Sequence, residues 1–168
     1  MSRAIRISLT LLAALVAACS SRPIRASSTT ASLVPVTKVT DGDTIHVTYL
    51  GRDERVRLIG VDTPEVPWYG GKSECYGVEA GLYARRRLSA RSVRLGFDVT
   101  RRDRYGRLLA YVYLGGELFN LTLVRLGYAV ADPVRPDTAM AVQFASAEAV
   151  ARTSGRGLWF ACPGRAPP

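Results

Sequence analysis

The sequence is poor in the residues that build many metal and catalytic centres. Its 168 residues include one histidine, His46, and three cysteines. A single histidine excludes a multi-histidine metal site and a serine–histidine–aspartate triad supported by a second histidine. Three cysteines are too few for a disulfide-dense scaffold, and their spacing is not that of a zinc knuckle. No internal repeat is visible.

The composition favours one basic domain with appendages. A hydrophobic content of 48% is enough for one packed core. Lysine and arginine total 23 against 14 acids, which gives a formal net charge of +9. Such a charge suits a polyanion such as nucleic acid, and it suits anionic lipid equally well.

The first 18 residues read as a signal peptide. Two arginines precede an apolar run at residues 7–18, which is too short to span a bilayer comfortably. The segment Val16–Cys19 resembles a bacterial lipoprotein box, in which the cysteine is lipidated; the alternative is ordinary cleavage after Ala18. Both predict export. No second run of spanning length follows, so we expect the remainder to be soluble.

Residues 19–33 are small and polar, and we interpret them as a lipid anchor followed by a flexible linker. Residues 163–168 read as a loose tail. The domain between them, residues 34–162, has the order of a mainly β, α+β fold: a five-stranded OB-type Greek-key barrel with three helices. The strands are predicted at 34–39, 44–50, 54–61, 93–100 and 107–114.

The three helices are predicted from apolar spacing and caps. The first spans about 73–91, with an apolar stripe of Val78, Leu82, Ala84 and Leu88. The second spans 120–125 and would be capped by Asn120. The third would be capped by Asp137 or Thr138 and would end at Gly155, with Phe144, Ala147 and Val150 at helical spacing.

Two aspartates are expected to converge at the ends of neighbouring strands. Asp43 precedes the second strand and Asp62 follows the third, and antiparallel neighbours place start against end. Two carboxylates, a backbone carbonyl and waters suit a hard cation such as Ca²⁺. The alternative is that Asp-Gly and Asp-Thr-Pro are ordinary turn formers.

Two arginines in the strands suggest that the cation site also binds phosphate. Arg57 lies on the third strand and Arg107 opens the fifth, and guanidinium groups match phosphate oxygens. Strict alternation places Arg57 on the face opposite to Asp62. Both reach one site only if the strand bends, and Gly60 is the expected place.

Three ordered motifs resemble the staphylococcal nuclease (thermonuclease) family: Asp41–Thr44, Arg57–Glu65 and Asp103–Tyr113. Segments 123–127 and 157–159 are similar too, so the resemblance covers about residues 34 to 162. It implies a Ca²⁺-dependent nuclease that hydrolyses DNA, RNA or both and that can act as an endonuclease. It also implies breakage of the P–O5′ bond, which leaves 3′-phosphate ends.

The resemblance also implies roles for single residues. Asp43 and Asp62 correspond to the calcium-binding aspartates, and Thr63 to the residue that gives its backbone carbonyl. Asp41 corresponds to an acid that bonds water on the metal. Glu65 corresponds to the catalytic glutamate, Arg57 and Arg107 to the phosphate-binding arginines, and Tyr105 to a tyrosine lining the nucleotide site. The tyrosines that follow the second helix in the family are missing from residues 129–136.

Other features leave alternatives open. Cys75 and Cys162 form a disulfide in an exported domain, or remain two separate thiols. Trp68 and Tyr69 offer a stacking platform for bases, or pack their loop. The arginines at 85–87, 91 and 94 contact phosphate, or form a solvated face. His46 is expected to be exposed and idle, and Trp159 to pack against the last helix.

These observations favour an exported, membrane-anchored, monomeric nuclease. Two rival hypotheses are a non-catalytic OB-fold protein that binds nucleic acid, and a structural lipoprotein of the envelope. DNA versus RNA preference, the balance of internal and terminal cleavage, and the membrane concerned stay open.

Overall fold

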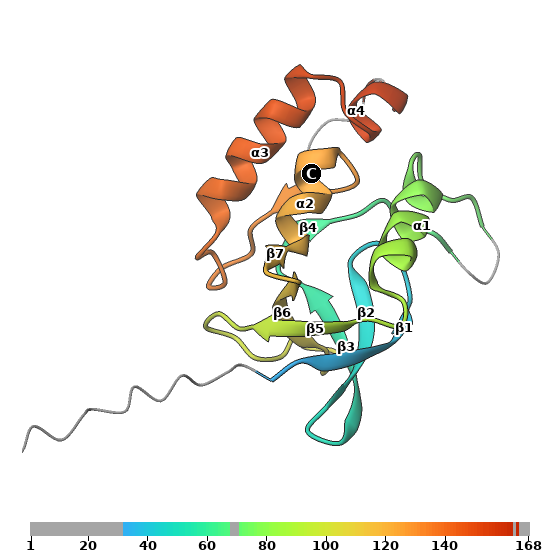
Figure 1. The fold of residues 1–168 in the computed structure, drawn as a ribbon. Helices are drawn as coiled ribbons and strands as arrows, with labels where there is room; N and C mark the ends of the chain where they lie inside the picture. Colours follow the sequence, from blue (N-terminus) through green and yellow to red (C-terminus); the bar gives the residue numbers. More distant parts are fainter. Residues whose placement is uncertain (1–31, 68–70, 163, 165–168) are drawn as a thin grey trace, which may run out of the picture. The chain divides into compact units, whose positions relative to one another are not determined.

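The computed structural model describes residues 32–67, 71–162 and 164 (Figure 1). The predicted signal peptide 1–18, the lipidation of Cys19 and nearly all of the linker lie outside the described residues. So do Trp68, Tyr69 and, apart from Gly164, the predicted tail. Within the described ranges, no helix has the length and hydropathy needed to cross a membrane.

Five strands close into the expected OB-type barrel. The strands β1 (Val34–Val39), β2 (Thr44–Tyr49) and β3 (Arg52–Leu58) form an antiparallel meander. β5 (Ser92–Gly96) pairs with β1, and β6 (Leu108–Leu114) pairs antiparallel with β5 and parallel with β3, which closes the barrel. The two-residue strand β7 (Glu117–Leu118) pairs antiparallel with the end of β6.

Side-chain alternation along the strands separates the core from the outer face. On β2, Ile45 and Val47 are fully buried, while His46 and Thr48 on the opposite face are partly exposed. Val56 of β3, Val112 of β6 and Phe119, which follows β7, belong to the same buried core. The outer face of β2 and β3 is therefore free to carry polar groups.

The third strand is interrupted, so its prediction as one strand over residues 54–61 is wrong. β3 ends at Leu58, and β4 (Gly60–Asp62) leaves the barrel to pair with β8 (Val130–Asp132). Gly60 has φ +76°, a left-handed conformation that glycine adopts without strain. A Cβ there would lie 2.4 Å from Cε2 of Phe144, so this position has no room for a side chain.

The first helix, α1 (Gly77–Leu88), is shorter than predicted and uses another face. It starts late because Tyr76 has a left-handed backbone, φ 71°, and it ends where Ser89 becomes extended. The buried face carries small residues and Leu88, so α1 packs closely. Val78 and Leu82, predicted to be buried, are 47% and 46% exposed.

Two predicted helix caps are also wrong. α2 (Phe119–Leu126) begins before Asn120, whose side chain is fully buried and bonds backbone groups of neighbouring segments. α3 (Ala141–Thr153) has no side-chain cap, and the Asp137 carboxylate instead accepts a hydrogen bond from the Thr100 N–H at 2.7 Å. Phe144 is buried as expected, but Val150 is exposed.

A short fourth helix, α4 (Leu158–Ala161), follows the three expected helices. Figure 1 shows α2 between the barrel and α3. Trp159 of α4 packs beside Val130, Leu158 and Cys162, in agreement with its predicted packing role.

Candidate active site

The turn between β1 and β2 is shaped by Asp41. Its Oδ1 accepts hydrogen bonds from the backbone N–H groups of Asp43 at 3.1 Å and Thr44 at 2.7 Å, which is an Asx turn. Burial raises the pKa of Asp41, against the hydrogen bonds from Thr44 and the charge of Arg57, which lower it. The turn directs the neighbouring side chain of Asp43 inward, where it is 3% exposed.

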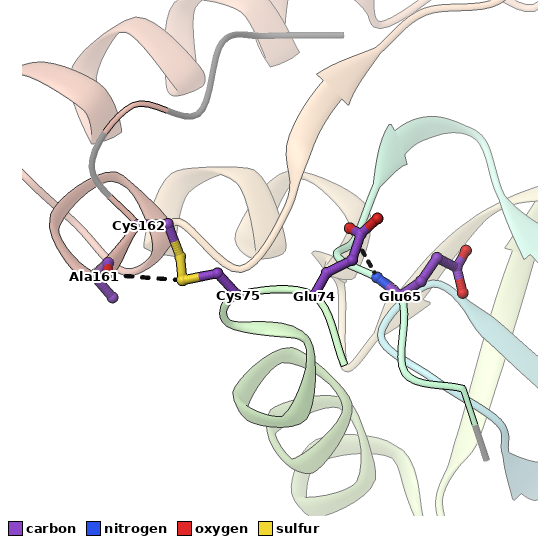
Figure 2. The surroundings of a disulfide bond; sticks show 5 residues. All are labelled: Glu65, Glu74, Cys75, Ala161 and Cys162. Atoms are coloured by element: carbon purple, nitrogen blue, oxygen red, sulfur yellow. Dashed lines mark hydrogen bonds between the residues drawn. A yellow bond between two sulfur atoms is a disulfide. The ribbon is translucent and has the colours of Figure 1, made fainter. Parts of the chain in front are cut away.

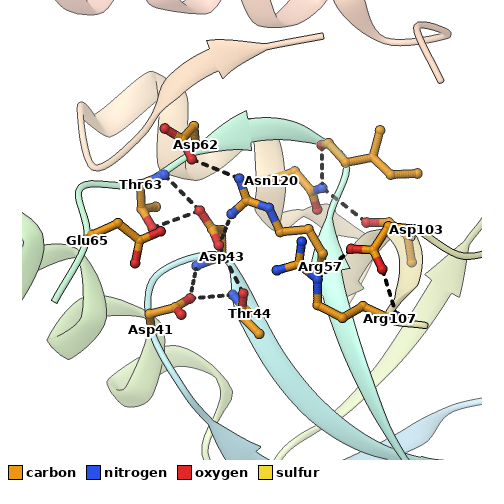
Figure 3. Close-up of polar contacts among 12 residues, drawn as sticks. Asp41, Asp43, Thr44, Arg57, Asp62, Thr63, Glu65, Asp103, Arg107 and Asn120 are labelled. Carbon is orange, nitrogen blue, oxygen red and sulfur yellow. Dashed lines mark hydrogen bonds and ion pairs between the residues drawn. The ribbon is translucent and has the colours of Figure 1, made fainter. Parts of the chain in front are cut away.

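Asp43 joins this turn to the segment that follows β4 (Figure 3). Its Oδ2 accepts hydrogen bonds from the N–H of Thr63 at 2.8 Å and from the Thr63 hydroxyl at 2.9 Å. Its Oδ1 accepts from the Thr44 hydroxyl at 3.1 Å and pairs with Nη1 of Arg57. The segment with Asp62, Thr63 and Glu65 is thus held against the start of β2.

Arg57 lies between the two aspartates expected to converge. Its Nη2 donates to Oδ1 of Asp62 at 2.8 Å, while Nη1 pairs with Asp43 (Figure 3). The contact is possible because the chain turns at Gly60, where the sequence predicted a bend. A single guanidinium therefore bridges the two carboxylates.

Arg107 approaches from the loop before β6. Asp103 accepts a hydrogen bond from Arg107 Nε at 2.6 Å and another from the Arg107 backbone N–H at 2.9 Å. Because Asp103 is bound through Nε, the terminal nitrogens of Arg107 are left to meet a ligand. Burial alone would raise the pKa of Asp103, but the hydrogen bonds and charge of Arg107 hold it below its ordinary value. Sequence reasoning missed this role of Asp103, although its Asx-turn position four residues before an arginine was a signal.

Glu65 completes one polar cavity of about 390 Å³, whose lining includes Asp41, Asp43, Arg57 and Arg107. The Glu65 side chain is exposed at the rim, yet enough protein surrounds it that desolvation raises its pKa, with further increases from the charges of Asp41 and Asp62. The Glu65 N–H donates to the Glu74 carboxylate at 3.2 Å (Figure 2). A raised pKa suits a group that accepts a proton near neutral pH.

A second cavity, of about 470 Å³, adjoins the first and shares Arg57 and Arg107 with it. Tyr105, predicted to line the nucleotide site, borders this cavity and is 61% exposed. From the stretch after α2 that lacks the tyrosines of the family, Asp132 and Val134 line this cavity, and sequence reasoning assigned neither.

The donor atoms of the site fit a hard divalent cation. Asp43 and Asp62 offer carboxylate oxygens, and Thr63 adds a backbone carbonyl next to Asp62. Both carboxylates already face one positive group, the Arg57 guanidinium, so their arrangement suits a shared cation. Across the described residues, no three or more histidine, cysteine, aspartate or glutamate side chains come together as a metal-binding group. The expected Ca²⁺ site does not require such a group, because its side-chain ligands are only two carboxylates.

Two other sequence hypotheses have outcomes in the structure. Cys75 and Cys162 are joined in a disulfide with Cα atoms 6.0 Å apart (Figure 2). His46 is half-buried rather than exposed as predicted, and Nδ1 of its ring bonds Oδ2 of Asp53 at 2.9 Å; that it has no functional role stays a prediction. Within the arginine run, Arg87 bonds Glu117 and the Tyr83 hydroxyl, whereas Arg86 and Arg91 are exposed.

Comparison with known proteins gives one consistent family. Residues 55–161 match the family model described as staphylococcal nuclease homologue. The chain is 40% identical over 124 residues to a thermonuclease of Staphylococcus intermedius, an alignment that covers 74% of each protein. It is 39% identical over 131 residues to the prophage-derived endonuclease YokF of Bacillus subtilis, covering 76% of this chain and 44% of that one. It is 38% identical over 128 residues to endonuclease YncB of the same species, covering 75% and 61%.

Proposed function

Since the chain belongs to the staphylococcal nuclease family, we propose that it is a Ca²⁺-dependent nuclease that hydrolyses DNA, RNA or both and leaves 3′-phosphate ends. One observation carries the proposal: the Arg57 guanidinium joins Asp43 to Asp62 at a cavity that Glu65 and Arg107 also line. A protein that only bound nucleic acid would not need Asp43 and Asp62 paired with one arginine at the edge of that cavity.

The acids and arginines have separate tasks in this proposal. Asp43, Asp62 and the Thr63 carbonyl would hold Ca²⁺, which when bound supplies positive charge to the phosphate. With Ca²⁺ held by the two aspartates, the Arg57 terminal nitrogens that pair with them here would turn to non-bridging phosphate oxygens, and those of Arg107 would donate there too. Both arginines would stabilise the charge that develops on these oxygens. Asp103 positions Arg107, and Asp41 fixes the turn that presents Asp43.

Glu65 orients a water molecule and accepts its proton. The water oxygen forms a new bond to phosphorus, the P–O5′ bond breaks, and the departing O5′ takes up a proton to become a hydroxyl. The 3′ oxygen keeps its bond to phosphorus, so the products are a 3′-phosphate and a free 5′-hydroxyl. Tyr105 borders the cavity beside the arginines, where the nucleoside next to the scissile bond would lie.

The test is incubation of the purified protein with plasmid and Ca²⁺. We expect degradation that EGTA abolishes, and 3′ ends that a polymerase extends only after phosphatase treatment. A gel shift without cutting would instead indicate a binding protein, and neither effect would indicate a structural lipoprotein. Cleavage that persists in EGTA would contradict the Ca²⁺ requirement.

Two substitutions test the residue roles. Glu65→Gln and Arg107→Ala should each lower kcat by at least about two to three orders of magnitude, with the urea midpoint of unfolding kept within error for Glu65→Gln. Glu79→Gln, which removes an exposed acid on α1 outside both cavities, is the matched control and should keep full activity. Turnover near the wild-type rate in either variant would remove that residue from the mechanism.

We further propose that the protein is exported and held at the cell envelope through lipid on Cys19, and that it acts as a monomer. The lipoprotein-like segment Val16–Cys19 and the polar linker after it support the anchor. Cys19→Ser should move the protein from the membrane fraction to the medium or periplasm of an expressing bacterium. An unchanged distribution would contradict the anchor, and a dimer mass in light scattering would contradict the monomer.

A further inference from the structure

A row of basic side chains extends the active-site cavity along the outer face of the barrel. Lys38 on β1 lies directly opposite His46 on β2, and His46 lies directly opposite Arg55 on β3. Directly opposite residues of neighbouring strands point to the same face. All three line the same cavity as Asp43 and Glu65. This basic row, Lys38–His46–Arg55, has no part in the chemistry described above.

The two long side chains of the basic row are available to bind an anion. Lys38 and Arg55 are exposed, and within the described part of the chain neither makes an ion pair or a side-chain hydrogen bond, although the charge of Lys38 contributes to lowering the pKa of Asp53. Asp53, two residues before Arg55 on β3, is held by the His46 ring at 2.9 Å and by the Thr37 hydroxyl at 2.8 Å. The next acid of β3, Glu54, is paired with Arg102.

The spacing between the basic row and the active-site residue Arg57 matches the repeat of a polynucleotide. Arg55 and Arg57 are two residues apart on β3 and share a face, so their Cα atoms are separated by roughly 7 Å. This distance is comparable with the separation of successive phosphates in an extended strand. Lys38 and Arg55 stand two strand spacings apart, about 10 Å, and both side chains are long enough to meet one phosphate above His46.

We propose that Lys38 and Arg55 bind the phosphate adjacent to the scissile one, so that the enzyme holds an internal stretch of a single strand rather than a chain end. The inference rests on the proposed nuclease function and deepens it. The same basic row would also attract a phosphate of a lipid headgroup, but its continuity with the cavity of Glu65 and Arg107 favours the polynucleotide.

Binding without cleavage tests the subsite directly. The double variant Lys38→Gln/Arg55→Gln is compared with wild type for binding of a fluorescent single-stranded oligonucleotide in EDTA, across a salt series. We expect the slope of log K against log salt to fall in magnitude by about 0.7 in the double variant, the value for one lost phosphate contact on a single strand. The matched control, Arg86→Gln/Arg91→Gln, removes the same charge from exposed positions outside both cavities and should keep the wild-type slope.

Three results would overturn the inference. The first is a wild-type slope in the double variant, and the second is an equal loss in the control variant, which would indicate general attraction by net charge. The third is loss of binding to anionic phosphatidylglycerol vesicles with strand binding retained, which would identify a lipid-facing site. Because these measurements need no turnover, they decide on the subsite even if the protein cuts nothing.

Cleavage of short substrates gives the second readout. In wild type, kcat/KM should rise from a dinucleotide with one phosphate to oligonucleotides that fill the row. In Lys38→Gln/Arg55→Gln the ratio of the long to the short substrate should fall toward one. A ratio equal to that of wild type would contradict the subsite, whereas absence of any cleavage by wild type would contradict only the proposed function.

Discussion

Each arginine of the candidate active site is positioned by a carboxylate. Asp62 and Asp43 hold Arg57, and Asp103 holds Arg107 through Nε. These contacts limit the rotamers of two long side chains before substrate arrives, which reduces the entropy lost on binding. They also make the acids part of the folded structure, so that a change in an acid affects stability as well as rate.

Asp103→Asn should reveal this double role through its pH dependence. The pKa of Asp103 in the folded protein lies below its ordinary value of 3.8, so the stabilisation is fully present above pH 3.8 and is lost as the pH falls through the folded value. At pH 7 we expect the variant to lose about 1–3 kcal/mol. Urea unfolding should show a difference from wild type that is constant above pH 5 and shrinks below pH 3.8. Glu79→Gln should show no such difference from wild type in either pH range. A constant difference down to pH 2 would contradict the assignment.

At this scale the sequence predicted which residues meet but not how they bond. Asp43 and Asp62 could be placed together because the start of β2 lies beside the end of β3, although Asp62 itself lies beyond the break, on β4. The hydrogen bonds from Thr63 to Asp43 could not be predicted, because they depend on how the chain leaves β4. Asn120 was assigned to a helix cap, since its pairing with the Ile59 carbonyl and the Val112 N–H joins segments distant in sequence.

Among the secondary-structure elements, the break between β3 and β4 does most to determine the site. Its turn at Gly60 brings Asp62 to the same side as Arg57, although strict alternation along one strand would separate them. The close approach of Phe144 from α3 requires glycine at this position. The core contact and the site geometry therefore depend on one residue.

Gly60→Ala should lose more stability than a matched glycine with the same backbone. Gly51 also has φ +76°, but nothing lies within 4 Å of a Cβ built there. Both alanine variants carry the left-handed backbone cost, roughly 1–2 kcal/mol. Gly60→Ala also overlaps Phe144, which adds about 1–3 kcal/mol, and it should lower kcat/KM because Asp62 moves relative to Arg57. Equal urea midpoints for the two variants, or full activity of Gly60→Ala, would contradict this account.

The elements were predicted best where burial follows a simple period. The strands of the barrel have β-branched residues in alternation, and their order identified the fold. The face of α1 was wrong because Ala80, Ala84 and the glycines at 77 and 81 bury a flat surface, while the larger Val78 and Leu82 stay outside. Apolar size alone does not reveal such close packing.

Over the whole described domain, the disulfide connects the C-terminal segment to the site. Cys162 follows α4, and its partner Cys75 stands next to Glu74, whose carboxylate accepts the Glu65 N–H (Figure 2). The proposed export would place the protein in an oxidising environment in which this bond persists. The crosslink thus restrains both the C-terminal segment and the segment that carries Glu65, the proposed catalytic glutamate.

Replacing both cysteines, Cys75→Ser/Cys162→Ser, should lower the free energy of unfolding. The bond spans a sequence separation of 87 residues, and loop-closure entropy gives roughly 4–5 kcal/mol for a loop of this size. Wild type in reductant should unfold at the urea midpoint of the double variant, and reductant should leave the variant unchanged.

Far below the unfolding transition the variant should keep its fold by circular dichroism but cleave more slowly, because Glu74 no longer fixes the Glu65 backbone as firmly. Glu74→Gln in the oxidised protein separates the two effects, since it should lower the rate while keeping most of the stability. An oxidised wild type that unfolds at the reduced midpoint would show that the crosslink contributes nothing to the stability of the fold.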